Sequence, residues 1–108
     1  MEAMSCGLPA IVTNYSAPTD YLNEQNGYPV KVAEMVDVYD PFYYPSSWDL
    51  GQWAQPDGAD LRRILRHVFE HPEEARAKGR QARADILERW TWDHAAAIAY
   101  RRLRPELF

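Results

Sequence analysis

The chain has 108 residues, with 12 basic and 16 acidic side chains and a formal net charge of −4. This length predicts one domain and excludes a two-domain enzyme, because domains usually run to about 100–150 residues. The acidic balance argues against a general nucleic-acid-binding protein. No apolar run approaches the ~20 residues of a membrane span, and the N-terminus lacks the pattern of a signal peptide. The single cysteine, Cys6, excludes an internal disulfide, so we expect a soluble cytoplasmic protein.

The first thirty residues show the pattern of an α/β fold. Residues 1–6 predict the end of a helix, because Gly7 can take the left-handed closing position. The run 9–13 is short, apolar and rich in β-branched residues, which is typical of a strand buried on both faces of a parallel sheet. A loop over 14–17 and a short helix that begins at Pro18 follow.

The middle of the chain predicts extended structure and then a long loop. From 28 to 38, valines alternate with polar or small residues, which indicates one or two extended segments. A loop from 40 to 58 follows. The segment 39–53 holds six aromatic residues, namely Tyr39, Phe42, Tyr43, Tyr44, Trp48 and Trp53. Aromatic faces stack on sugar rings, so a loop that contacts the acceptor or the donor is one interpretation. The favoured interpretation is a loop held in place by its own aromatic side chains.

The second half predicts three consecutive helices. The first has an apolar stripe at helical spacing, formed by Leu61, Ile64, Leu65, Val68 and Phe69. Asp57 or Asp60 can cap its start, and Pro72 ends it and opens the second helix. The second helix has a narrower apolar face, formed by Ala75, Gly79, Ala82, Ile86, Leu87 and Trp90. Thr91 can cap a last helix from Trp92, whose inward face is expected to hold Ala95, Ile98, Ala99 and Leu103.

The predicted elements do not add up to a complete domain. A strand that is apolar on consecutive positions, as at 9–13, needs parallel neighbours on both sides and helices over both faces. The sequence supplies one or two further strands, and none before it. We therefore predict an α/β fold in a partial Rossmann-like arrangement, with two or three strands followed by three helices. Residues 1–108 are interpreted as the second part of a domain.

The opening segment resembles the Glu-Ala-Met-Ala-Cys-Gly-x-Pro-Val-Ile-Ala-Thr segment of the group 1 glycosyltransferases, the family 4 retaining enzymes of the GT-B architecture. In this chain the segment is Glu2-Ala3-Met4-Ser5-Cys6-Gly7-Leu8-Pro9-Ala10-Ile11-Val12-Thr13. Later features match in the same order: the loop 14–20, Asn26-Gly27-Tyr28, Trp53-Ala54-Gln55-Pro56-Asp57 and Glu88-Arg89-Trp90-Thr91-Trp92. The resemblance covers nearly the whole chain. It implies that residues 1–108 are the last part of the family's C-terminal, nucleotide-sugar-binding domain.

The resemblance implies a donor site around Glu2. Of the two donor-binding glutamates of the family, the second maps to Glu2, which would accept hydrogen bonds from the two ribose hydroxyls of a nucleotide diphospho-sugar. Asn14, Tyr15 and Ser16 are further candidates, because they follow the carboxyl end of a strand, where open α/β sheets bind ligands. No cofactor beyond the nucleotide-sugar substrate is implied.

The same resemblance places much of the catalytic machinery outside this chain. The first glutamate, its glycine-bearing loop, the basic pair that neutralises the diphosphate and the acceptor-binding N-terminal domain have no counterpart in residues 1–108. Residues 1–56 carry a single base, Lys31, which is a poor substitute for that pair. We therefore expect the chain alone to be inactive. In the family the last helix crosses to the N-terminal domain, so its apolar face is expected to lack its normal cover.

A second hypothesis belongs to a different class. A non-catalytic α/β interaction module would self-associate, or pair with a missing partner, through the unpaired sheet edge beside Ile11 and Val12. Cys6 is expected to be a buried packing group, and Trp90 and Trp92 are expected to pack at a helix junction. The three histidines lack metal-ligand spacing, which predicts no metal site at His67, His71 or His94.

Overall fold

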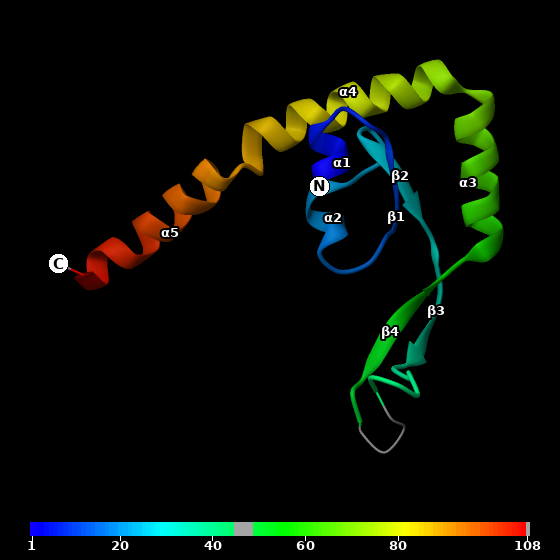
Figure 1. The fold of residues 1–108 in the computed structure, drawn as a ribbon, viewed down its shortest axis with the longest axis horizontal. Helices are drawn as coiled ribbons and strands as arrows, with labels where there is room; N and C mark the ends of the chain where they lie inside the picture. The colour runs from blue at the N-terminus through cyan, green and yellow to red at the C-terminus, as the bar shows by residue number, and fades with distance from the viewer. Residues whose placement is uncertain (45–48, 108) are drawn as a thin grey trace.

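The computed structural model describes residues 1–44 and 49–107, with side chains described as far as residue 104. Its elements, in chain order, are α1 (Glu2–Ser5), β1 (Ala10–Thr13), α2 (Pro18–Tyr21), β2 (Gly27–Val30), β3 (Val32–Asp37), β4 (Gln52–Pro56), α3 (Gly58–Glu70), α4 (Pro72–Arg89) and α5 (Trp92–Leu107). The fold is mixed α/β, which confirms the predicted class (Figure 1). The predicted strand number was too low, because the described residues form four strands. None of the helices in the described ranges is long and apolar enough to cross a bilayer.

The body of the molecule is a short parallel sheet between two helical layers. β1 pairs in parallel with β2, with Ala10 opposite Gly27 and Thr13 opposite Val30. The pleat sends alternate residues of β1 to opposite faces. On one face, Ala10 and Val12 pack against a buried cluster from α1, α4 and the end of α2, formed by Met4, Leu22, Ala82 and Ile86. On the other face, Ile11 packs against a second cluster, formed by Tyr28, Val30 and Ile64, which brings in α3.

Two glycines allow α1 and α4 to lie in direct contact. Gly7 ends α1 with a φ of +79°, which confirms the predicted left-handed position. A Cβ added at Gly79 of α4 would lie 2.1 Å from the carbonyl oxygen of Gly7 and 3.2 Å from the nitrogen of Pro9. Only glycine fits this crossing, which sets the position of α1 and of the turn into β1. Arg83 of α4 also donates to the carbonyl of Ser5.

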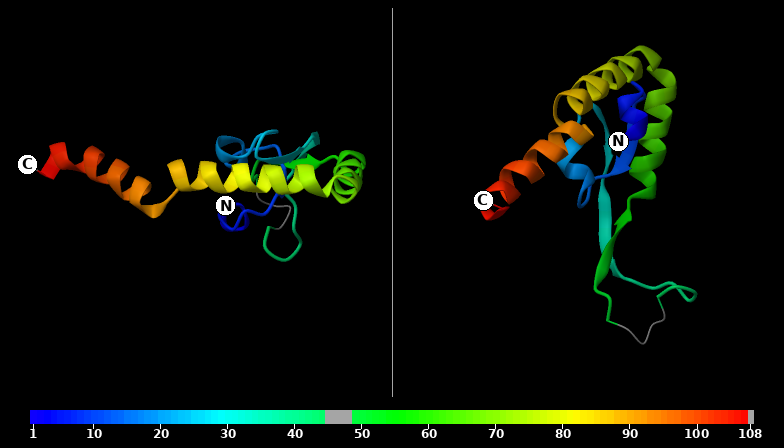
Figure 2. Two further views of the ribbon diagram at one scale, coloured as in Figure 1. Left: turned by 90° about the horizontal axis from the view of Figure 1, so that it is seen from above. Right: turned by 60° about the vertical axis from the view of Figure 1, so that its left-hand side comes forward.

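The second sheet is a hairpin that leaves the body. β3 and β4 pair in antiparallel fashion, with Val36 opposite Trp53 and Asp37 opposite Gln52. The prediction of an unbroken loop from 40 to 58 was therefore wrong over β4. The sequence of β4 contains two glutamines and a proline, and its apolar and polar residues do not alternate. Pairing with β3 is therefore what makes this segment a strand. The hairpin and α5 both extend away from the body (Figure 2), and the Cα radius of gyration is 17.9 Å.

The three predicted helices are confirmed as α3, α4 and α5. The structure decides between the two candidate caps of α3: the Asp57 carboxylate accepts from the backbone N–H groups of Ala59 and Asp60. Asp60 instead accepts from the backbone N–H of Lys31 at 2.9 Å, which ties the start of α3 to the end of β2. Thr91 precedes α5, and its hydroxyl oxygen accepts from the N–H of His94 at 3.4 Å.

Several residues predicted to be buried are exposed. They are Cys6, Leu65, Phe69, Leu87, Trp90 and Trp92. The face of α5 formed by Ala95, Ile98, Ala99 and Leu103 is also exposed, which agrees with the expectation that the last helix lacks its normal cover. The predictions followed helical periodicity, which identifies an apolar face but not whether another element covers it. Trp92 is 90% exposed, whereas Trp90 is 40% exposed and makes an edge contact with Tyr21. The structure therefore shows apolar helix faces that the described residues leave uncovered.

Candidate functional site

The loop after β1 lies at the carboxyl edge of the parallel sheet. The backbone N–H of Asn14 donates to the carbonyl of Val30 at 2.8 Å, and the N–H of Tyr15 donates to the carbonyl of Thr13 at 2.8 Å. Ser16 has a φ of +59°, an uncommon conformation for a residue other than glycine. The side chains of these three candidate residues, Asn14, Tyr15 and Ser16, are exposed. The loop is thus held by its backbone and leaves its side chains available to a ligand.

Glu2 opens α1, and its carboxylate is fully exposed. Its own backbone N–H donates to the carboxylate and the amino group of Met1 lies 3.6 Å away, so the pKa of Glu2 is below its ordinary value. α1 and β1 run in opposite directions (Figure 1), so Glu2 lies at the end of α1 that faces the carboxyl edge of the sheet. The carboxylate therefore offers two acceptor oxygens at neutral pH.

A groove of about 350 Å³ lies beside Glu2, between α1 and the junction of α4 and α5. It is lined by Met1, Glu2, Ser5, Ile86, Leu87, Trp90, Thr91 and Trp92. A second groove, of about 320 Å³, shares Met1, Trp90, Thr91 and Trp92 and extends over Ala95 and Ile98. Both grooves are lined mainly by apolar side chains, with the Glu2 side chain in the first groove and Arg89 in the second.

The structure does not join the predicted site residues into one cluster. Among the hydrogen bonds and ion pairs of the described residues, none links Glu2 to Asn14, Tyr15 or Ser16. Glu2 and the loop 14–16 are separate exposed features of the described structure. Their role in binding a nucleotide sugar stays a prediction.

A polar cluster between α3 and α4 was missing from the sequence predictions. Glu74 accepts from the hydroxyl of Tyr28 at 3.3 Å and lies 3.0 Å from Nε2 of His67. Lys78 lies over the ring of Tyr28, 4.3 Å from its centroid, and donates to the carbonyl of Glu24. The histidine contact, above all, holds the pKa of Glu74 below its usual value, whereas burial raises the pKa of Tyr28. These residues come from β2, α3 and α4, so no spacing in the sequence connects them.

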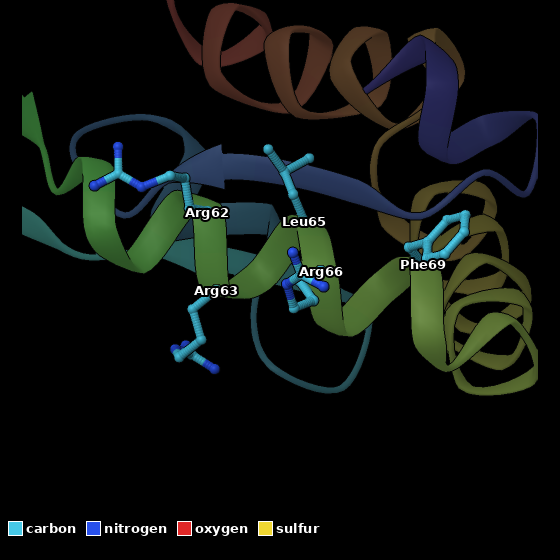
Figure 3. Close-up of a pocket in the computed structure, with 5 residues that line it drawn as sticks. All are labelled: Arg62, Arg63, Leu65, Arg66 and Phe69. Carbon is cyan, nitrogen blue, oxygen red and sulfur yellow. The ribbon is translucent and has the colours of Figure 1, made fainter.

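The outer face of α3 carries three arginines beside two exposed apolar side chains (Figure 3). Arg62, Arg63, Leu65, Arg66 and Phe69 line a shallow groove of about 610 Å³. Arg63 pairs with Asp60 at 2.7 Å and Arg66 pairs with Glu70 at 3.6 Å, so two of the three charges are matched within the helix. The groove is therefore less basic than its composition indicates.

The aromatic residues of the hairpin do not hold the loop in place as predicted. The side chains of Tyr39, Phe42, Tyr43, Tyr44 and Trp53 are all exposed, and Trp48 lies outside the described residues. The favoured interpretation of this segment was therefore wrong for the five described residues. Among the described residues, the contacts of β3 and β4 are mainly with each other, so no helix covers these rings.

Searches against protein-family models, curated proteins and solved structures find no match to this chain. Within the described residues there is no group of three or more His, Cys, Asp or Glu side chains that could hold a metal ion.

Proposed function

We propose that residues 1–108 are the C-terminal part of the nucleotide-sugar-binding domain of a retaining glycosyltransferase with a Rossmann-like fold. The whole enzyme would transfer a sugar from a nucleotide diphospho-sugar to an acceptor hydroxyl. In it, Glu2 would accept hydrogen bonds from the two ribose hydroxyls. Asn14, Tyr15 and Ser16 would close the donor pocket.

The observation that carries this proposal is the placement of the motif residues on the fold. The motif that begins at Glu2 forms a helix, a glycine turn and the parallel strand β1, in that order. α1 runs opposite to β1, so Glu2 opens the end of α1 that faces the carboxyl edge of the sheet, and the loop after β1 leaves that edge, which is where open α/β sheets bind ligands (Figure 1). An exposed, ionised carboxylate suits a vicinal diol, since each of its oxygens can accept one hydroxyl hydrogen bond.

A second observation supports a sheet that continues beyond the two described strands. The N–H of Asn14 donates to Val30 and so continues the hydrogen-bond ladder between β1 and β2. In a parallel pair, alternate residues of a strand bond to the same neighbour. The N–H and C=O of Ile11 and the N–H of Thr13 therefore point away from β2. On β2, the same alternation places the nitrogen of Pro29 on the outer edge, where a proline costs no ladder bond. β2 thus has a protected edge, whereas the open edge of β1 carries neither proline nor charge.

Titration with nucleotide diphosphates tests the donor site. UDP, GDP and ADP are added to the wild-type chain, to Glu2→Ala, and to the matched control Glu73→Ala, which removes an exposed first-turn carboxylate from α4. We expect one nucleotide to shift backbone amide resonances near Glu2 and the loop 14–16, with weaker binding in Glu2→Ala and unchanged binding in the control. Equal responses from all three proteins would remove Glu2 from the site.

The open edge of β1 also favours a second candidate function, a non-catalytic module that adds a strand from itself or from a partner. Thr13→Pro removes a donor on the open edge, whereas Val12→Pro removes one that bonds to β2. If the edge mediates self-association, Thr13→Pro yields monomers of wild-type helical content by light scattering and circular dichroism. A wild-type chain that is a compact monomer, with a radius of gyration near ~13 Å, contradicts this function.

A further inference from the structure

The turn after β3 has a fixed backbone. One carboxylate oxygen of Asp40, Oδ1, accepts from the N–H groups of Phe42 and Tyr43 at 2.8 and 2.9 Å. The backbone of Asp40 also exchanges two hydrogen bonds with Tyr44, at 3.1 and 2.8 Å. Four hydrogen bonds therefore close five residues, which we call the aromatic turn (residues 40–44). In Figure 2 it reaches away from the body at the far end of the hairpin.

The aromatic turn presents its rings to solvent. Phe42 is 85% exposed and Tyr43 is 73% exposed, and the two rings meet edge to face with centroids 5.4 Å apart. Tyr44 and the preceding Tyr39 are also exposed. A turn closed by its own hydrogen bonds does not need these rings for its folding. Large exposed apolar groups gathered on one projection are typical of a binding surface.

The charge around the turn selects the chemistry of the ligand. From 32 to 57 the sequence contains no lysine or arginine. The carboxylates of Asp37, Asp40 and Asp49 come from the end of the hairpin that carries the turn, whereas Asp57 caps α3 at the other end. Such a surface repels phosphate groups, nucleic acids and anionic lipid headgroups. A neutral saccharide fits it, because the C–H face of a pyranose ring stacks on an aromatic face and its hydroxyls donate to carboxylates.

The position of the hairpin connects this surface to the proposed donor site. β3 continues directly from the carboxyl end of β2, and the loop 14–16 follows the carboxyl end of β1, so both leave the same edge of the parallel sheet (Figure 1). A ligand on the hairpin would therefore approach from the edge toward which Glu2 also lies.

We propose that the aromatic turn binds a neutral saccharide and holds a sugar unit of the acceptor that lies outside the contact of the acceptor with the N-terminal domain of the whole enzyme, an assignment that rests on the proposed function. Phe42 and Tyr43 supply the stacking surface. Asp40 is a positioning residue, because its carboxylate is already engaged with the two N–H groups that orient those rings.

The test uses the 108-residue chain and defined oligosaccharides. Maltotriose, cellotriose and chitotriose are the neutral probes, and trigalacturonic acid is the anionic comparison, each at millimolar concentration and followed by amide and aromatic NMR shifts. The double variant Phe42→Ala/Tyr43→Ala removes the stacking surface. Phe69→Ala is the matched control, because Phe69 is also 85% exposed but lies on α3.

We expect at least one neutral trisaccharide to shift resonances of the aromatic turn, with little response to trigalacturonic acid. The double variant should weaken this binding by about tenfold or more, and Phe69→Ala should leave it unchanged. Asp40→Ala should weaken saccharide binding although both rings are present. Asp40→Asn, which keeps the acceptor oxygen, should restore that binding. Rescue by asparagine separates positioning from charge.

Three outcomes would overturn the proposal. They are no response to any neutral probe, equal weakening in the double variant and the Phe69→Ala control, or binding of a basic peptide or zwitterionic vesicles at the turn in place of sugars. A different result separates the two proposals: saccharides bind the turn, but wild type and Glu2→Ala respond equally to nucleotides. This result keeps the sugar site and overturns its assignment to an acceptor. Nucleotide binding that depends on Glu2, without any saccharide binding, overturns only the inference about the turn.

Discussion

The body and the hairpin of this protein both contain many apolar residues, but their burial is very different. In the body, both faces of the parallel sheet are covered, and residues such as Met4 and Ala82 are almost completely buried. In the hairpin, no described residue is buried, although β3 and β4 contain valines, a methionine and a tryptophan. An isolated two-stranded hairpin is marginally stable at best in water. The difference indicates that the body folds around its own core, whereas the described residues of the hairpin build none.

The largest expected effect is at the crossing of α1 and α4. Gly79→Val would drive a side chain into the carbonyl of Gly7, and Gly79 has no room to shift because Pro9 lies on the same side. We expect a loss of about 3 kcal/mol or more, enough to unfold a chain with so small a core. Urea denaturation followed by circular dichroism measures it. Gly58→Ala, where the nearest atom to the new Cβ lies 3.8 Å away, is the control and should change stability by less than about 1 kcal/mol.

A smaller loss of stability is expected at Ile86 of α4, and its neighbour Leu87 serves as the comparison. Ile86 is buried against Met4 and Leu22, whereas Leu87 is 49% exposed. Ile86→Ala should cost about 2–5 kcal/mol, because it leaves a cavity in the body. Leu87→Ala should cost less than about 1 kcal/mol in the same urea experiment. Equal losses would show that Leu87 is covered in solution, for example by a second copy of the chain.

Two carboxyl groups of the body should contribute to the pH dependence of stability. The backbone N–H of Lys31, first, and the guanidinium of Arg63 hold the pKa of the Asp60 carboxyl below its ordinary value. A carboxyl with a lowered folded-state pKa stabilises the fold above its unfolded pKa, and this stabilisation is lost as the pH falls through the folded pKa. The melting temperature of the wild type should therefore fall on acidification below about pH 4.

The variant Asp60→Asn identifies the source of that fall. It should lower the melting temperature at pH 7 and reduce the loss between pH 4 and pH 2. Glu74, whose pKa is lowered mainly by His67, should contribute in the same direction. A wild-type melting curve that does not respond to acid would contradict both assignments.

The smallest expected effect is on the hairpin itself. Phe42→Ala should change the stability of the chain by no more than about 0.5 kcal/mol, because the ring buries little against the rest of the protein. The measurement is the same urea midpoint. A loss comparable to that of Ile86→Ala would mean that the aromatic turn packs against the body in solution and is not a free binding surface.

The sequence predicted most of the local structure of the body. Gly7, the β-branched run at 10–13 and the apolar stripe from Leu61 act through neighbouring residues, so their patterns are visible along the chain. β4 was missed because the glutamines and the proline of Gln52–Pro56 have no strand preference of their own. Of the candidate site, the sequence identified Glu2 and the loop 14–16. It could not identify the contacts of Glu74 with Tyr28 and His67, since these join three separate elements.

By itself, the sequence determined the class of the fold, the limits of the long helices and the cap of α3 to within two candidates, because these depend on periodicity, proline and glycine. Only the tertiary structure decided which apolar faces are covered. Ile64 and Phe69 belong to one predicted stripe, yet Ile64 is buried and Phe69 is exposed. Burial depends on whether another element lies opposite, and that is a property of the assembled fold. The same reason explains why the aromatic residues of the hairpin, predicted to hold a loop together, instead form an exposed surface.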